Sequence, residues 1–166
     1  MSLLLGVIKQ SVKVSIFCWK AAKLLILGQD ALATKAAKES DAIRIGLFGA
    51  SLVAPGIIIT PAYSSSNIIV HGVASRSQEK AEKFAKKHGI PKTYDGYQAM
   101  LDDPEIDAVY NALPNTLHFE WTLKALKAGK HVLNEKPLAT NLADAEKLYQ
   151  KAKEVNLVLF DGYLSR

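Results

Sequence analysis

The sequence predicts an α/β fold, a doubly wound parallel sheet of about six strands with helices on both faces. From Ala42 onward, short apolar runs alternate with helix-length segments at the spacing of βαβ units. The apolar runs are continuous rather than alternating, as in strands that are buried on both faces. Six such strands fill a Rossmann sheet, in which right-handed crossovers are the default.

Local signals predict where the elements begin and end. The first strand is expected at 43–48, and a short helix follows it from about Leu52 until Pro61 ends it. Ser77 can cap a helix that runs to His88, where Gly89 directly follows. The other strands are expected at 68–74, 93–94, 106–111, 131–133 and 157–160, and the other helices at 96–101, 116–128 and 141–155.

Charge divides the chain into two parts. Residues 1–38 carry six lysines against one acidic residue, Asp30, whereas the remaining chain has 15 basic and 15 acidic residues. We therefore expect residues 1–41 to form a basic helical extension and linker, and residues 42–166 to form an NAD(P)-binding Rossmann domain. Because the surplus of +5 lies in the extension, no nucleic-acid partner is expected.

The residue pattern of the extension predicts a basic amphipathic helix over residues 3–27. Lysines interrupt its apolar residues, so no run approaches the ~20 residues that span a bilayer. At helical spacing Lys9, Lys13, Lys20 and Lys23 share one sector, and most apolar side chains point the other way. Such a helix can pack on the domain, contact a partner, lie on a membrane surface or direct organelle targeting. The expected location is otherwise cytoplasmic.

The residues that usually bind metals are sparse. A single cysteine, Cys18, excludes an internal disulfide and a cysteine-cluster metal site. His71, His88 and His131 show no ligand spacing, so we expect no metal site.

The turn after the first strand predicts a phosphate site. It reads Gly49-Ala50-Ser51, so Ser51 replaces the second glycine of the usual fingerprint. A tight turn before a helix lets backbone N–H groups face a pyrophosphate. The alternative is a turn of small residues that serves only close packing.

The end of the second strand predicts which dinucleotide binds. An NAD site usually places an acidic residue there to accept bonds from the ribose hydroxyls. This chain has Ser75 and Arg76 instead, and a guanidinium can pair with a 2′-phosphate. NADP is therefore preferred over NAD, and a solvated loop arginine is the alternative.

The fifth strand leads into Glu135, Lys136 and Pro137, where we place the chemistry. Lys136 can donate to a substrate oxygen or transfer a proton, and Glu135 can hold its ammonium. Pro137 fixes its own backbone and keeps Lys136 out of helical geometry. The alternative is a surface loop with an incidental charge pair.

The fourth strand leads into Leu113, Pro114 and Asn115, with His118 one turn further on. Asn115 can cap the next helix, which we favour, or bond to a cofactor amide. His118 can face the site or fill a polar corner.

In this order, these motifs resemble the glucose-fructose oxidoreductase/inositol dehydrogenase (Gfo/Idh/MocA) family over residues 42–163. The dimeric dihydrodiol dehydrogenase and NADP-dependent D-xylose dehydrogenase branch is most similar. The resemblance implies reversible hydride transfer between NADP and a sugar or dihydrodiol carbon. It assigns Lys136 to the substrate hydroxyl, Glu135 and Pro137 to the shape of the site, and Pro114, Asn115 and His118 to the nicotinamide side. It also implies a cis bond before Pro137.

The chain departs from the family pattern after its sixth strand. Relatives continue into a second domain that forms the substrate pocket, the dimer sheet and a catalytic tyrosine, and Tyr163 does not match that tyrosine by position. We therefore expect a truncated, cofactor-binding half with doubtful turnover and no family-type dimer. The alternative is a non-catalytic dinucleotide-binding or interaction module that docks through its N-terminal helix.

Overall fold

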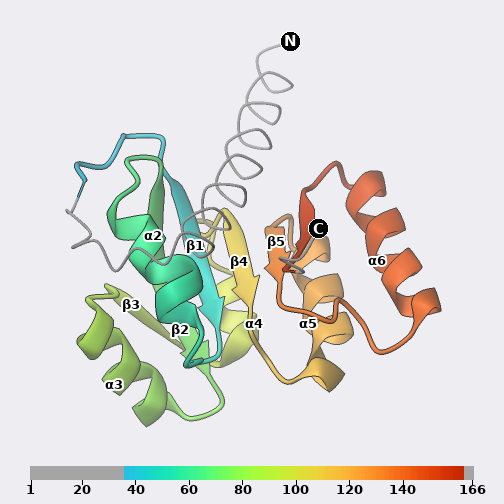
Figure 1. Cartoon of the computed structure of the whole chain (residues 1–166), viewed down its shortest axis with the longest axis horizontal. Coiled ribbons are helices and arrows are strands. Elements are labelled where there is room, and N and C mark those ends of the chain that lie inside the picture. Colours follow the sequence, from blue (N-terminus) through green and yellow to red (C-terminus); the bar gives the residue numbers. More distant parts are fainter. Residues whose placement is uncertain (1–35, 163–166) are drawn as a thin grey trace.

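The architecture is a six-stranded parallel sheet with the strand order β3-β2-β1-β4-β5-β6 (Figure 1). This computed structural model describes residues 36–162, so the predicted helix at 3–27 and Tyr163 lie outside the described residues. The order confirms the predicted doubly wound sheet. The strands are β1 (Ile43–Phe48), β2 (Ile68–Ser75), β3 (Lys92–Asp95), β4 (Ala108–Asn111), β5 (His131–Asn134) and β6 (Leu159–Asp161).

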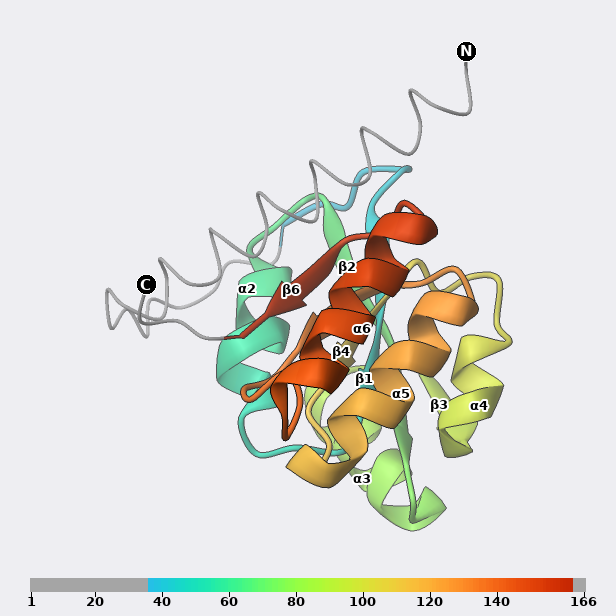
Figure 2. The same ribbon diagram turned by 90° about the vertical axis from the view of Figure 1, so that its right-hand side faces the viewer.

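Helices cover both faces of the sheet, and each layer closes its own core (Figures 1 and 2). On one face lie η1 (Pro55–Ile59), a π-helical segment, α2 (Thr60–Tyr63) and α3 (Gln78–His88). On the other face lie α4 (Gly96–Leu101), α5 (Asn115–Lys127) and α6 (Leu142–Glu154). Residues of β1, such as Leu47 and Phe48, are fully buried because both layers pack against this central strand.

Most of the predicted helix caps and helix ends are confirmed. The Ser77 hydroxyl caps α3 by accepting from the Lys80 backbone N–H at 3.3 Å, and Gly89 ends that helix with a φ of 62°. The prediction that Pro61 ends the first helix is wrong. Pro61 is the second residue of α2, which continues η1 without a break because the Thr60 N–H donates to the Pro55 carbonyl.

In the part of the chain that the structure describes, no helix has the length and hydropathy needed to cross a bilayer.

The edge at which the strands begin, the amino edge, is held by buried polar side chains. Lys130 is 7% exposed, and its ammonium donates to the carbonyls of Asp103 and Ile106 at 2.8 and 2.7 Å. His131 accepts from the Val158 backbone N–H at 3.0 Å. Burial lowers the pKa of both side chains. These two side chains thus serve the structure of the amino edge.

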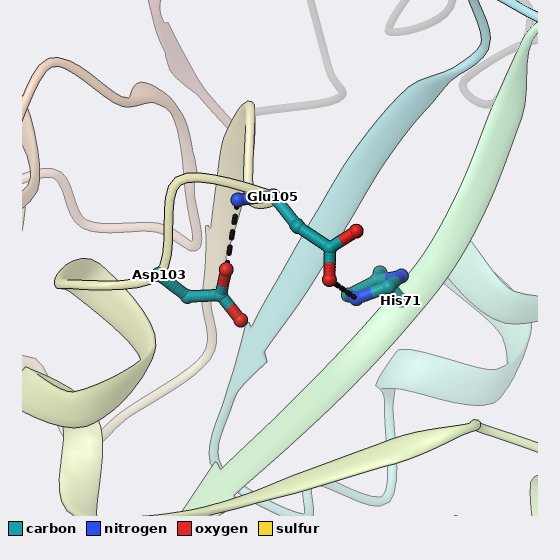
Figure 3. Close-up of side chains that lie close together, drawn as sticks. All are labelled: His71, Asp103 and Glu105. Carbon is teal, nitrogen blue, oxygen red and sulfur yellow. Dashed lines mark hydrogen bonds and ion pairs between the residues drawn. The ribbon is translucent and has the colours of Figure 1, made fainter.

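An ion-pair cluster also lies at the amino edge (Figure 3). His71 is the residue that the β1–β2 register skips, and its Nε2 lies 3.6 Å from a Glu105 carboxylate oxygen. Asp103 accepts from the Glu105 backbone N–H at 2.8 Å and from the Tyr94 hydroxyl at 2.7 Å. The side chains of His71, Asp103 and Glu105 come close enough to share a cation, which their sequence spacing did not predict.

Two cations already neutralise this cluster. The Lys92 ammonium binds Asp103 and lies 3.9 Å from Glu105, and Arg44 lies 3.5 Å from Glu105. Two carboxylates therefore meet two cationic side chains, and we assign this cluster to the structure of the amino edge and not to a metal.

We predict that Gly72→Ala destabilises the protein, because an added Cβ would lie 2.4 Å from the Tyr94 ring. Tyr94 is buried and its hydroxyl is engaged by Asp103, so overpacking is expected to cost roughly 1–3 kcal/mol in urea unfolding. Gly56→Ala is the control, because nothing lies within 4 Å of its added Cβ. Equal unfolding midpoints for the two variants would contradict the close approach of Tyr94.

We predict that Asp103→Asn lowers the unfolding free energy at neutral pH. We also expect the variant to lose less stability in acid than the wild type does. Hydrogen bonds from Lys92 and then from Tyr94 hold the pKa of Asp103 below its ordinary value of 3.8. A lowered folded-state pKa gives stability that is complete above that ordinary value and is lost as pH falls below it. The unfolding free energies of the two proteins should differ by roughly 2 kcal/mol at pH 6, and this difference should narrow toward pH 3. A constant difference would contradict this account.

Candidate functional site

The predicted site residues follow strand ends that share one edge of the sheet, the carboxyl edge. Gly49 follows β1, Arg76 follows β2, and Glu135 and Lys136 follow β5. All neighbouring strands are parallel and their last residues are in register, with Phe48 beside both Ala74 and Asn111, and Asn111 beside Asn134. Gly49, Arg76 and Lys136 therefore lie at one common edge of the sheet. Ligands of such sheets bind at this edge, where the crossovers change direction between β1 and β4.

The turn after β1 has an open row of backbone donors. Gly49 has a φ of 91°, which a residue with a Cβ rarely adopts, and its N–H donates to the Ala74 carbonyl at 2.8 Å. Among the described residues, no acceptor receives the N–H groups of Ala50, Ser51 or Leu52. The helix that follows has no side-chain cap at its start. Leu52 is 96% exposed, whereas Gly49, Ala50 and Ser51 are half-buried.

The tip of β2 presents a cation to solvent. Arg76 is exposed, and the Ser75 hydroxyl accepts from the Ser77 N–H at 3.4 Å. Below them, Tyr97 packs against Phe48 with ring centroids 5.4 Å apart. Burial raises the pKa of Tyr97, and the nearby Arg76 opposes that rise.

One carboxylate lies near this tip. Asp95 ends β3, stands opposite Ser75 in the ladder and is exposed. It comes from a different strand than the acidic residue that usually holds an adenine ribose.

The loop after β5 is organised differently from its prediction. The Lys136–Pro137 bond is cis, as the resemblance implied. The Glu135 carboxylate accepts from the Tyr110 hydroxyl at 2.6 Å and from the Lys136 backbone N–H at 3.4 Å, and not from the Lys136 ammonium. Tyr110 is fully buried, and burial followed by the contact with Glu135 raises its pKa. Glu135 is thus fixed from β4, which leaves the Lys136 side chain exposed at the edge.

The segment after β4 contains an exposed and a buried part. Pro114 and Asn115 are exposed, whereas Leu113 is 6% exposed and His118 is 1% exposed. Asn115 is the first residue of α5, and no side chain caps this helix, so the favoured capping role is not observed. His118 points inward, with one ring nitrogen 2.7 Å from the Leu113 carbonyl oxygen and the other 2.7 Å from that of Pro137.

Sequence reasoning gave no role to three buried polar residues near His118, namely Asn111, Thr122 and Asn134, all of them fully buried. Asn111 donates to the Thr122 hydroxyl at 3.1 Å, and this hydroxyl donates to the Asn134 side chain at 2.8 Å. The sequence did contain a signal for this network. Asn111 and Asn134 each end an apolar strand, and an amide side chain buried there needs polar partners nearby.

The residues at the carboxyl edge fit a dinucleotide. The unbonded N–H groups and the uncapped helix start can receive a pyrophosphate, for which a Cβ-free residue with positive φ provides the turn. Arg76 can pair with a 2′-phosphate on the adenine ribose. Pro114, Asn115 and Lys136 are exposed on the β4 and β5 side, where the other end of an extended dinucleotide would reach.

A separate cavity of about 210 Å³ lies near the beginning of β2, away from this edge. Its lining is mainly apolar and includes Ile59, Tyr63, Ile68 and Ile90. Because it contains none of the predicted site residues, we do not assign the dinucleotide to it.

Comparisons with known proteins agree with this geometry. The chain is 43% identical over 123 residues to a dTDP-3,4-didehydro-2,6-dideoxy-alpha-D-glucose 3-reductase of Streptomyces violaceoruber, which covers 74% of this chain and 36% of that protein. It is 41% identical over 97 residues to a trans-1,2-dihydrobenzene-1,2-diol dehydrogenase of Xenopus laevis, covering 58% and 29%. The chain therefore spans about a third of the length of these relatives.

Solved structures give the same result. The 3-ketoreductase KijD10 of Actinomadura kijaniata, in complex with NADP and TDP-benzene, superposes with a TM-score of 0.69 and 38% identity. The match covers 72% of this chain and 37% of that one. The family model described as an oxidoreductase family with an NAD-binding Rossmann fold matches residues 43–163. The chain, with the turn after β1 and its Glu-Lys-Pro loop at one edge of the sheet, belongs to this Gfo/Idh/MocA oxidoreductase family.

Proposed function

We propose that this chain binds NADP at the carboxyl edge and supplies the cofactor-binding part of an oxidoreductase that acts on a sugar-like hydroxyl or carbonyl group. The observation that carries the cofactor choice is Arg76, an exposed guanidinium at the tip of β2, where an NAD site usually has an acidic residue. The solved relative in complex with NADP supports the same choice.

The substrate class rests on the relatives and on Lys136. The name of the Streptomyces relative describes a reductase of a dTDP-linked sugar. The Actinomadura relative is described as a 3-ketoreductase. When bound, the cofactor supplies or accepts a hydride. The exposed Lys136 ammonium can donate a hydrogen bond and then a proton to the oxygen of the carbon that receives the hydride. Oxidation of a hydroxyl reverses both transfers.

Glu135 has a supporting role in this proposal. The buried Tyr110 hydroxyl donates to the Glu135 carboxylate. The carboxylate is therefore held next to Lys136 without forming an ion pair with the Lys136 ammonium.

We predict that Arg76→Ala weakens NADPH binding by roughly 10- to 100-fold, which corresponds to the loss of charge-assisted hydrogen bonds to a phosphate. NADH binding should change by less than about threefold, because NADH has no 2′-phosphate. Fluorescence titration measures both. Arg44→Ala is the control, since it removes a half-buried arginine, paired with Glu105, at the opposite edge of the sheet. Tighter binding of NADH than of NADPH by the wild type would refute the NADP assignment.

We predict that Lys136→Met preserves NADPH affinity within about threefold and lowers the rate of NADPH oxidation with keto-sugar substrates by roughly 100-fold or more. Methionine keeps the length of the side chain but cannot donate a proton. Stopped-flow or steady-state absorbance measures the rate, and Lys127→Met on an exposed part of α5 is the control. If the wild type binds NADPH but does not oxidise it with any such substrate, the catalytic part of the proposal is wrong and the cofactor part stands.

A further inference from the structure

The two loops at the nicotinamide end of the proposed site are joined by one buried ring. His118, on α5, has its Nε2 2.7 Å from the Leu113 carbonyl oxygen and its Nδ1 2.7 Å from the Pro137 carbonyl oxygen. Leu113 follows β4, and Pro137 belongs to the loop that follows β5. The ring is 1% exposed, so water does not compete for these bonds.

Each ring nitrogen of His118 faces one backbone carbonyl oxygen. A carbonyl oxygen only accepts, so each bond requires an N–H on the ring nitrogen that faces it. The Asn134 side-chain amide lies 3.2 Å from Nδ1 and can donate to this nitrogen when it carries no proton. In the tautomer with a proton on Nε2, the ring donates to the Leu113 carbonyl and accepts from the Asn134 amide at Nδ1, so it joins the end of β4 to the end of β5.

A second chain of hydrogen bonds links the same two loops without passing through the His118 ring. The Leu113 N–H donates to Asn111, Asn111 donates to Thr122, and Thr122 donates to Asn134. Asn134 in turn donates to the Glu135 carbonyl at 2.5 Å. The end of β4, helix α5 and the start of the Glu135–Pro137 loop are thus linked through fully buried groups. Such a network is costly to break because its members would be left unsatisfied away from water.

We propose that His118, supported by Thr122 and Asn134, is a positioning residue that sets the Glu135–Lys136–Pro137 loop against the end of β4. This inference rests on the proposed function, because its consequence is the placement of Lys136 beside the bound cofactor. His118 acts through the backbone carbonyls and does not contact the cofactor, which replaces the nicotinamide contact that the family resemblance implied.

The first test does not depend on a cofactor. Hydrogen exchange measured by mass spectrometry should show the Glu135, Lys136 and Leu138 amides exchanging roughly 10-fold faster in His118→Leu than in the wild type, which is the factor expected for one lost buried hydrogen bond. His118→Gln keeps a donor at a similar reach and should restore part of the protection. Thr122→Val, which breaks the second chain without a change in shape, should act in the same direction as His118→Leu.

The matched control is His131→Gln. His131 is also buried and lies on β5, but it is at the amino edge, where it accepts from Val158. Its loss should reduce overall stability without faster exchange at 135–138. Equal protection of this loop in the wild type and in His118→Leu, or equal loosening in His131→Gln, would overturn the proposal.

The second test separates the two ends of the site. Adenosine 2′,5′-bisphosphate occupies only the end near Arg76, whereas NADPH also reaches the loops joined by His118. His118→Leu should weaken NADPH by about tenfold and the bisphosphate by less than about threefold. Equal weakening of both ligands would show general destabilisation and would count against a positioning role. If the wild type binds neither ligand, the proposed function fails, while the exchange experiment still decides the role of His118.

Discussion

The constraint on which the rest depends is the parallel pairing of β1 with β2 on one side and β4 on the other. Because all strands run the same way, every strand end lies at the same edge, and the connections leave β1 in opposite directions. The turn after β1 and the segment after β4 therefore lie where the crossovers change direction, which is where ligands of such sheets bind. Residues 49, 76 and 136 are far apart in sequence, and this pairing alone brings them to a common edge.

The two edges of the sheet have different chemistry. At the amino edge, the cationic side chains are used up by carbonyls and carboxylates, as with Lys130 and Lys92. At the carboxyl edge, Arg76 and Lys136 are exposed, and the turn after β1 leaves backbone N–H groups without acceptors. Charge that is already paired stabilises the fold, whereas the exposed cations Arg76 and Lys136 and the unbonded N–H groups can bind an anionic ligand.

The site combines an exposed surface with a buried support. Tyr110 fixes Glu135 from below, and His118 ties the loop of Pro137 to the end of β4. Both supporting residues are buried and come from elements other than β5. A loop that carries chemistry gains its precision from such partners, since a short charged loop by itself has too few contacts to hold one conformation.

The sequence by itself determined the strand and helix alternation, the turn at Gly49, the cap at Ser77 and the edge at which Arg76 and Lys136 lie, because these follow from local patterns and from parallel pairing. Local patterns could not show that Glu135 turns to Tyr110, that His118 faces inward, or that Pro61 is accommodated in a helix after a π-helical segment. Only the tertiary structure decided these, because a buried polar group takes whichever partner the packing of distant elements brings within hydrogen-bonding distance.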